Sequence, residues 1–255
     1  IDEGLKEELR AQVLDMSKKI RHRGPDWSGV YTGDNAILSH ERLSIVDPLS
    51  GKQPLVSDDG KIILAANGEI YNHKEIRKEF EGKYNFQTGS DCEAIIPLYK
   101  KFRECGDFTL MIEKLSGIFA FALYDSENDV YLVARDEIGV IPLYQGWDKA
   151  GRFYVASELK ALEGECQTIE EFPNGHYFYS KDEKPVRWYK REWENFDAVK
   201  NKKFHIYAVS TIDEGIEVLT GVPAGKRDKD GNFPAGTINR LVYEKLKKYA
   251  KVCER

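Results

Sequence analysis

Three short segments of the chain carry side chains that together could bind an α-amino acid. They contribute an arginine, an asparagine followed by a glycine, and an aspartate: Arg42, Asn67, Gly68 and Asp91. A guanidinium pairs with a carboxylate through two parallel hydrogen bonds, and a carboxylate can receive an ammonium group. A side-chain amide and a neighbouring glycine N–H can donate to an oxyanion. The set predicts a site that binds an α-carboxylate at Arg42, an α-ammonium at Asp91 and a side-chain carbonyl at the Asn-Gly pair.

Each segment also has a purely structural interpretation, and the residues alone leave both interpretations open. Arg42 could be an ordinary surface residue ahead of a strand. Asn67 followed by Gly68 is the strongest two-residue signal for a hairpin turn. Asp91 could cap the helix that is expected to follow it.

These segments contain no evident nucleophile. Cys92 follows Asp91, but it falls on a predicted helix without a nearby histidine, so we interpret it as a buried, inert thiol. The five histidines, at positions 22, 40, 73, 176 and 205, show no metal-ligand spacing and no clear dyad. We therefore predict no metal site, and structural roles for His22 and His40.

The elements that must position these residues are helices and many short strands. An apolar residue every three to four positions predicts a helix over 5–20. Further helices are expected over 73–80 after Asn72, over 92–104 with Pro97 inside, and over 108–115. Short β-branched or aromatic runs predict strands at 30–31, 36–38, 43–46, 62–66, 118–124, 130–134, 143–145, 153–156, 177–179 and 186–189. This order favours an α+β fold of stacked layers over a βαβ nucleotide-binding fold, whose glycine-rich motifs do not occur.

Composition excludes several classes of protein. The 255 residues include 38 Lys and Arg against 43 Asp and Glu, so the chain lacks the basic excess of a nucleic-acid binder. The 12% of aromatic residues argue against disorder. No apolar run approaches the roughly 18 residues of a membrane span, no signal peptide is evident, and the four cysteines form no CxxC pair. We expect a cytoplasmic protein without nucleic-acid or membrane partners.

The chain changes character near residue 200, which predicts two domains, 1–200 and 201–255. The second is expected to be a small α/β segment, because about 50 residues are few for an independent core. Its expected elements are a strand over 204–209, a helix over 212–219 capped by Ser210 or Thr211, and a final helix capped by Thr237.

Eight motifs stand in an order that resembles a known family. They are RHRGPD at 21–26, RLSIVD at 42–47, NGEIYNH at 67–73, TGSDCE at 88–93, FAFALYD at 119–125, RDEIGVIPLY at 135–144, ASELKAL at 156–162 and FPNGHY at 172–177. The set resembles the N-terminal glutaminase domain of glutamine-hydrolysing asparagine synthetase, a class II glutamine amidotransferase. The resemblance implies an N-terminal-nucleophile fold, with helices flanking two stacked antiparallel sheets in αββα order.

The resemblance also implies a substrate and roles for individual residues. L-glutamine would be hydrolysed to glutamate and ammonia, with its carboxylate held by Arg42 and its α-amino group by Asp91. Asn67 and Gly68 match the oxyanion hole. The same substrate lining would include Leu43, Ile45, Val46 and Glu69. No cofactor is implied for the glutaminase half, because ATP and Mg²⁺ belong to the synthetase domain; that domain or a second copy of the chain is the implied partner.

In two respects the sequence departs from the family pattern. The family begins with Cys-x-Ile-x-Gly in a strand ahead of the first helix, and that cysteine attacks the amide. This sequence opens with the expected helix, so we expect the nucleophile to be absent from this chain and little or no glutaminase activity. The SGGxDS phosphate loop of the synthetase domain does not occur either, so we do not expect this chain to make asparagine.

Residues 204–255 resemble a different family, the C-terminal end of Lon-type proteases. The resemblance rests on the runs FHIYAVSTIDEGIEVLTGVPAG and GNFPAGTINRLVYEKL. No protease residue carries over, because the Ser–Lys pair of that family lies upstream of this piece. Two alternatives to a glutaminase therefore stay open: a non-catalytic glutamine-binding or interaction module, and a chimera with a Lon-type fragment.

Overall fold

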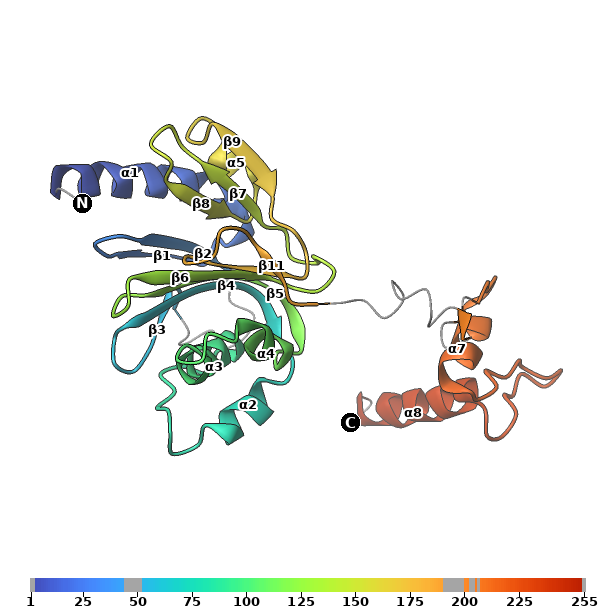
Figure 1. The fold of residues 1–255 in the computed structure, drawn as a ribbon. Coiled ribbons are helices and arrows are strands. Elements are labelled where there is room, and N and C mark those ends of the chain that lie inside the picture. Colours follow the sequence, from blue (N-terminus) through green and yellow to red (C-terminus); the bar gives the residue numbers. More distant parts are fainter. Residues whose placement is uncertain (1–2, 44–51, 190–199, 202–204, 206, 254–255) are drawn as a thin grey trace. The chain divides into compact units, whose positions relative to one another are not determined.

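The computed structural model of the chain describes residues 3–43, 52–189, 200–201, 205 and 207–253 (Figure 1). The chain divides into two compact units, 1–190 and 191–255. Each unit is described by itself below.

The first unit opens with the expected helix. Helix α1 covers Glu3–Lys19, and Leu9 and Met16 are buried on one of its faces. An acidic residue in its first turn and two lysines in its last turn suit the helix dipole. A short 3-10 turn, Arg21–Arg23, follows and leads into the first hairpin.

A six-stranded antiparallel sheet forms the centre of the first unit. Its strand order is β11-β10-β6-β5-β4-β3. The strands cover Leu55–Val56 (β3), Ile62–Ile70 (β4), Gly117–Asp125 (β5), Val130–Arg135 (β6), His176–Tyr179 (β10) and Val186–Arg187 (β11). The longest pairing joins β4 to β5 over nine residues each, from Ile62 opposite Asp125 to Ile70 opposite Gly117.

Two smaller sheets pack on one face of the six-stranded sheet. They are the hairpin of β1 (Trp27–Thr32) with β2 (Ile37–Arg42), and the sheet β8-β7-β9, formed by Tyr144–Trp147 (β7), Phe153–Ala156 (β8) and Thr168–Glu171 (β9). Apolar clusters fill the two contacts, one around Val133 and Phe172 and the other around Ile63 and Tyr124. Helix α1 packs on β2 and on the short helix α5 (Leu159–Leu162), outside these smaller sheets.

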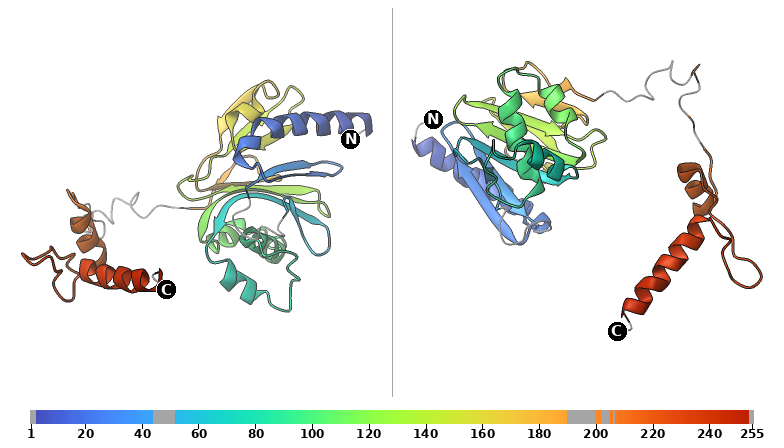
Figure 2. Two further views of the ribbon diagram at one scale, coloured as in Figure 1. Left: turned by 180° about the vertical axis from the view of Figure 1, so that it is seen from behind. Right: turned by 90° about the horizontal axis from the view of Figure 1, so that it is seen from below.

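Helices cover the opposite face of the six-stranded sheet and enclose the largest core. They are α2 (His73–Glu79), the 3-10 turn Asp91–Ala94, α3 (Ile95–Phe102) and α4 (Phe108–Glu113). Fully buried aromatic rings, among them Tyr99, Phe108 and Phe119, join the helices to the sheet. The layers therefore run helix, sheet, sheet, helix, as two further views also show (Figure 2). This confirms the expected α+β fold in αββα order.

Three local expectations differ from the structure, and in the first two a longer-range contact replaces a local one. Asn67 and Gly68 do not form a hairpin turn; they lie inside β4, opposite Ala120 and Phe119. Asn72 does not cap α2, because its side chain bonds the backbone of 114 and 116 instead. The expected helix over 92–104 begins as a 3-10 turn, and α3 starts at 95, which leaves Pro97 in the first turn, where its missing N–H costs nothing.

The regular structure described in the second unit consists of helices. Helix α7 covers Ile212–Thr220, Thr211 caps it by accepting from the Glu214 N–H, and Gly221 ends it in the left-handed conformation. Helix α8 covers Ile238–Cys253, and Thr237 Oγ1 accepts from the Arg240 N–H at 3.4 Å. The caps are as expected. The predicted strand over 204–209 is wrong for the described residues of that range, 205 and 207–209, which have no regular structure.

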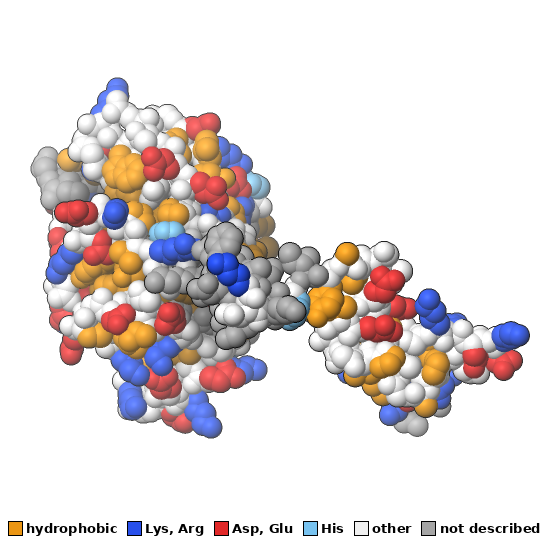
Figure 3. All heavy atoms as spheres, turned by 45° about the vertical axis from the view of Figure 1, so that its right-hand side comes forward, with side chains coloured by type: hydrophobic (Ala, Val, Ile, Leu, Met, Phe, Trp, Pro, Cys, Tyr) orange, Lys and Arg blue, Asp and Glu red, His pale blue; other side chains and the backbone are white. Residues whose placement is uncertain are grey.

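Apolar side chains lie at the surface of the second unit among charged ones (Figure 3). On α8 they are Leu241, Val242, Leu246 and Tyr249, each about half exposed. Among the helices described in either unit, none is both long and apolar enough to cross a membrane.

Candidate functional site

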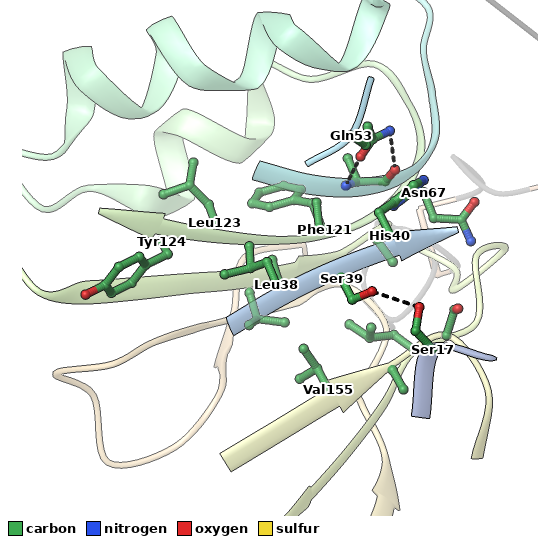
Figure 4. Close-up of a pocket in the computed structure, with 18 of the residues that line it drawn as sticks. Ser17, Leu38, Ser39, His40, Gln53, Asn67, Phe121, Leu123, Tyr124 and Val155 are labelled. Carbon is green, nitrogen blue, oxygen red and sulfur yellow. Dashed lines mark hydrogen bonds between the residues drawn. The ribbon is translucent and has the colours of Figure 1, made fainter. Parts of the chain in front are cut away.

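A cavity of about 780 Å³ lies between the stacked sheets of the first unit (Figure 4). Strand β2 and strand β8 line its sides, β4 and β5 line its floor, and α1 contributes to its lining as well. Six of the eight residues predicted to bind substrate line this cavity: Arg42, Leu43, Asn67, Gly68, Glu69 and Asp91. The other two, Ile45 and Val46, lie outside the described residues.

Strand β2 directs Arg42 toward the floor of the cavity. Side chains alternate across a strand, so Leu38, His40 and Arg42 share the face that lies toward the six-stranded sheet. The opposite face is held by α1, where Ser17 Oγ donates to Glu41 and accepts from Ser39, both at 2.8 Å. Arg42 is only 7% exposed. The hairpin thus buries a guanidinium in the wall of an otherwise largely apolar cavity.

His40 is the second polar residue on that face, and it lies at the same end of the cavity as Asn67 (Figure 4). Burial, reinforced by the Arg42 charge, lowers the pKa of His40 from 6.5 to about 4, although Glu41 opposes the shift. The imidazole is therefore neutral at physiological pH. It adds no charge beside Arg42 that would compete for a bound carboxylate.

The lowered pKa of His40 predicts a loss of stability in mild acid. The unfolded chain takes up this proton near pH 6.5, whereas the folded chain takes it up only near pH 4. Stability is therefore complete above pH 6.5 and falls by about 2 to 3 kcal/mol as the pH drops to 4. We expect His40→Gln to remove this loss in urea unfolding measured across the range. A variant with the same decline as the wild type would contradict the assignment, and the exposed His22→Gln is the control.

The outer edge of β4 presents a backbone N–H at every second residue, as an antiparallel ladder requires. Four of these five groups have partners: Ile62 with Ser57 Oγ at 2.9 Å, Leu64 with its register partner Leu55, Ala66 with Gln53 Oε1 at 2.7 Å, and Ile70 with the Asp91 carboxylate at 2.7 Å. The fifth, the Gly68 N–H, has no partner on this edge among the described residues. It stands in the cavity lining between the side chains of Gln53 and Asp91.

Only glycine fits at position 68. Its φ of +127° is a conformation that other residues rarely adopt, and an added Cβ would lie 2.0 Å from the Ile118 carbonyl oxygen. The neighbouring Asn67 lines the cavity, and among the described residues its side-chain amide has no hydrogen-bond partner (Figure 4). An amide N–H and a backbone N–H from consecutive residues thus stand at one place in the cavity, as an oxyanion site requires.

Asp91 lies at the same end of the cavity and is 6% exposed. Its carboxylate accepts the Ile70 N–H at 2.7 Å, which ties it to the end of β4. The adjacent Cys92 thiol lies 3.8 Å from the same carboxylate and is buried. Burial, and secondly the Asp91 charge, raise the pKa of Cys92, so the thiol stays protonated and agrees with an inert role.

A buried carboxylate that the sequence interpretation missed holds the loop before Asp91. Glu93 is 1% exposed and accepts from the Gln87 N–H at 2.6 Å and the Thr88 N–H at 2.7 Å. Arg77 donates to the carbonyl oxygens of the same loop, to Ser90 at 2.6 Å among them. The TGSDCE motif contained the signal for this network, since its glutamate comes shortly after Gly89, Ser90 and Asp91, residue types that commonly form turns.

Metal binding has no support from the described part of the chain, in which no three His, Cys, Asp or Glu side chains come together. The chemistry of the cavity is that of its Arg, Asp, Asn and glycine N–H groups. These groups are complementary to an amino acid that carries a carbonyl on its side chain.

Comparison with known proteins agrees with this geometry. A family model described as the glutamine amidotransferase domain matches residues 3–193. The chain belongs to this family. It is 54% identical over 194 residues to asparagine synthetase B [glutamine-hydrolyzing] of Escherichia coli (strain K12), covering 76% of this chain and 34% of that protein. It is 42% identical over 219 residues to asparagine synthetase [glutamine-hydrolyzing] 1 of Arabidopsis thaliana, covering 85% of this chain and 36% of the relative.

Solved structures show the same fold. One is the allosteric regulatory enzyme of purine biosynthesis, with a TM-score of 0.50 and 28% identity over 61% of this chain and 35% of that one. The other is a glutamine phosphoribosylpyrophosphate amidotransferase from B. subtilis, with a TM-score of 0.54 and 24% identity over 70% of this chain and 46% of that one. The chain spans about a third of the length of the two synthetases. The resemblance of 204–255 to Lon-type proteases stays a prediction.

Proposed function

We propose that the first unit binds L-glutamine and, together with a cysteine-led segment, hydrolyses its side-chain amide to glutamate and ammonia, as the glutaminase part of an asparagine synthetase. The observation that carries the proposal is the Gly68 N–H, which has no hydrogen-bond partner among the described residues. It lies beside the Asn67 amide in a cavity that also holds Arg42 and Asp91. The similarity to proteins named as glutamine-hydrolysing synthetases supports it.

The binding mode follows from the charge of each group. The Arg42 guanidinium would bind the α-carboxylate, and Asp91 would accept the α-ammonium with the carboxylate oxygen that Ile70 leaves free. The side-chain carbonyl would then lie against Asn67 and Gly68. When a thiolate adds to that carbonyl, the oxygen gains a full charge and both donors bind it more tightly, which lowers the barrier. The proton that the thiol gave up passes to the amide nitrogen, the C–N bond breaks and ammonia leaves. Water then hydrolyses the resulting thioester to glutamate and the free thiol.

The cavity also has room for the segment that would carry the nucleophile. In the described residues β2 pairs only with β1, and β8 pairs only with β7, so each has a free edge. Strands β2 and β8 both line the cavity along their lengths. We propose that an extended segment led by a cysteine pairs there and brings its thiolate to the Asn67 end, because an unpaired strand edge accepts a further strand.

The proposal makes a two-step test possible. The chain as printed is expected to bind L-glutamine in isothermal titration calorimetry, and the absence of both heat and a thermal shift would overturn the proposal. The same chain preceded by a Cys-x-Ile-x-Gly strand is expected to release ammonia from glutamine. The matched control carries Ala in place of that Cys and should bind without hydrolysis. Binding without hydrolysis in the folded cysteine form would instead favour a non-catalytic glutamine-binding module.

The wider assignments are part of the same proposal. The ammonia would be used by a synthetase domain, which would also bind ATP and Mg²⁺, so that the glutaminase unit would need no cofactor. A synthetase-domain partner, a homodimer and a cytoplasmic location stay predictions from the sequence resemblance.

A further inference from the structure

Gln53 replaces a strand residue at the edge of β4. Strand β3 pairs with β4 only through Leu55 and Val56, opposite Leu64 and Ile63. At Ala66, the next residue of β4 whose backbone groups point outward, the partner is the Gln53 side chain. Its Nε2 donates to the Ala66 carbonyl at 2.9 Å, and its Oε1 accepts the Ala66 N–H at 2.7 Å (Figure 4). A side-chain amide thus makes the two bonds that a backbone partner would make.

Strand β1 packs closely against the backbone of Gln53. Gly29 faces it so closely that an added Cβ would lie 1.9 Å from the Gln53 carbonyl oxygen. The Gln53 side chain is 8% exposed and lines the cavity. With its nitrogen and its oxygen each bonded to Ala66, the amide has little freedom to turn toward a ligand.

The position of Gln53 also affects the next backbone N–H on the outer edge of β4. That group is the Gly68 N–H, and Asp91 holds the group beyond it at Ile70. The two side chains therefore fix β4 on either side of Gly68, whose N–H has no partner in the part of the chain that the structure describes. A backbone strand continued along this edge would instead have covered the Gly68 N–H.

We propose that Gln53 is a positioning residue for the two donors at Asn67 and Gly68, an inference that rests on the proposed function. Gln53 makes no contact with substrate in this assignment. It holds the backbone at Ala66, and so directs the adjacent donors at the side-chain carbonyl of glutamine. Arg42 and Asp91, which would bind the α-amino acid group, are placed by other contacts: Arg42 lies on β2, which Ser17 of α1 bonds through Glu41, and Asp91 is bonded by the Ile70 N–H.

Because different residues would bind the side-chain carbonyl and the α-amino acid group, a comparison of two ligands can distinguish a positioning role of Gln53 from a general structural role. L-norvaline carries the same α-amino acid group as L-glutamine but has no side-chain carbonyl. We expect Gln53→Met, which is similar in length and cannot make the two bonds, to weaken glutamine binding about fivefold in calorimetry on the full chain. Norvaline binding should not change. The wild-type chain is measured with both ligands, and circular dichroism confirms that the variant is folded.

The possible outcomes separate this inference from the proposed function. If the wild-type chain does not prefer glutamine to norvaline, the proposed function falls, and the role of Gln53 falls with it. If the wild type prefers glutamine and folded Gln53→Met keeps the full preference, only the role of Gln53 is overturned. Equal weakening of both ligands would also overturn it, because Gln53 would then support the whole site.

A second variant decides the matter if Gln53→Met does not fold. In Gln53→Glu only the protonated carboxyl can donate to the Ala66 carbonyl, because the carboxylate has no hydrogen to give. We expect the glutamine-to-norvaline preference to be lost at pH 8 and to return in part at pH 5, while the wild-type preference stays constant. A preference in Gln53→Glu that does not depend on pH would overturn the inference.

Discussion

Replacement of Arg42 by methionine is expected to lower the affinity for L-glutamine about 100-fold. The variant loses two charge-assisted hydrogen bonds to the α-carboxylate, each contributing about 1.5 kcal/mol, and the resulting 3 kcal/mol corresponds to two orders of magnitude in Kd. The loss is large because Arg42 is buried in the cavity wall, where water cannot replace it. Calorimetry on the folded variant measures the effect.

Two further variants test whether geometry as well as charge matters. Arg42→Lys keeps the charge but not the planar fork, so it should recover only part of the affinity. Arg10→Met removes an arginine from the exposed face of α1 and should bind glutamine like the wild type. Wild-type affinity in folded Arg42→Met would exclude this residue as the carboxylate clamp.

Replacement of Gly68 by alanine is expected to lower the free energy of unfolding by about 3 kcal/mol or more and to abolish glutamine binding. Two costs combine. The φ of +127° is strained for any residue with a Cβ, and that Cβ would lie 2.0 Å from the Ile118 carbonyl oxygen on the partner strand. Because the contact is with backbone, β4 and β5 must separate, which displaces the N–H that would bind the oxyanion. Urea unfolding and calorimetry measure the two losses.

Gly60 provides the matched control for this variant. It also has a positive φ, of +74°, but an added Cβ would meet nothing within 4 Å. Gly60→Ala should therefore show the backbone strain alone, about 1 kcal/mol, with unchanged glutamine binding. If Gly68→Ala is no less stable than Gly60→Ala, the close approach of β4 to β5 is not the cause.

Helices with strong local signals could be predicted from the sequence. The apolar face of α1 repeats every three to four residues, and the free energy of burying that face depends little on what covers it. The ends of α7 were predictable for a similar reason, since Thr211 and Gly221 satisfy backbone groups within the helix itself. In both cases the stabilising contact lies within a few residues of the signal.

The Asn67-Gly68 pair shows where local signals fail. Taken alone, it favours a hairpin turn, but nine residues of β4 pair with β5, and this ladder outweighs a two-residue preference. Gln53 carried no signal, because its partner Ala66 is 13 positions away and is bound through backbone atoms that any residue has.

For the candidate site too, some features could be predicted from the sequence and others depend on the tertiary structure. Its chemistry could be proposed from the sequence, because an arginine, an aspartate and an Asn-Gly pair together suit an α-amino acid, although each segment alone also had a structural interpretation. Their convergence, and the lack of a described partner for the Gly68 N–H, depend on the tertiary structure. Arg42, Gly68 and Asp91 are more than 20 residues apart in pairs, and only the stacking of β2 on β4, with Asp91 bonded to Ile70, brings them to one cavity. Such contacts depend on the free energy of the whole packed core, and a short stretch of sequence does not contain that information.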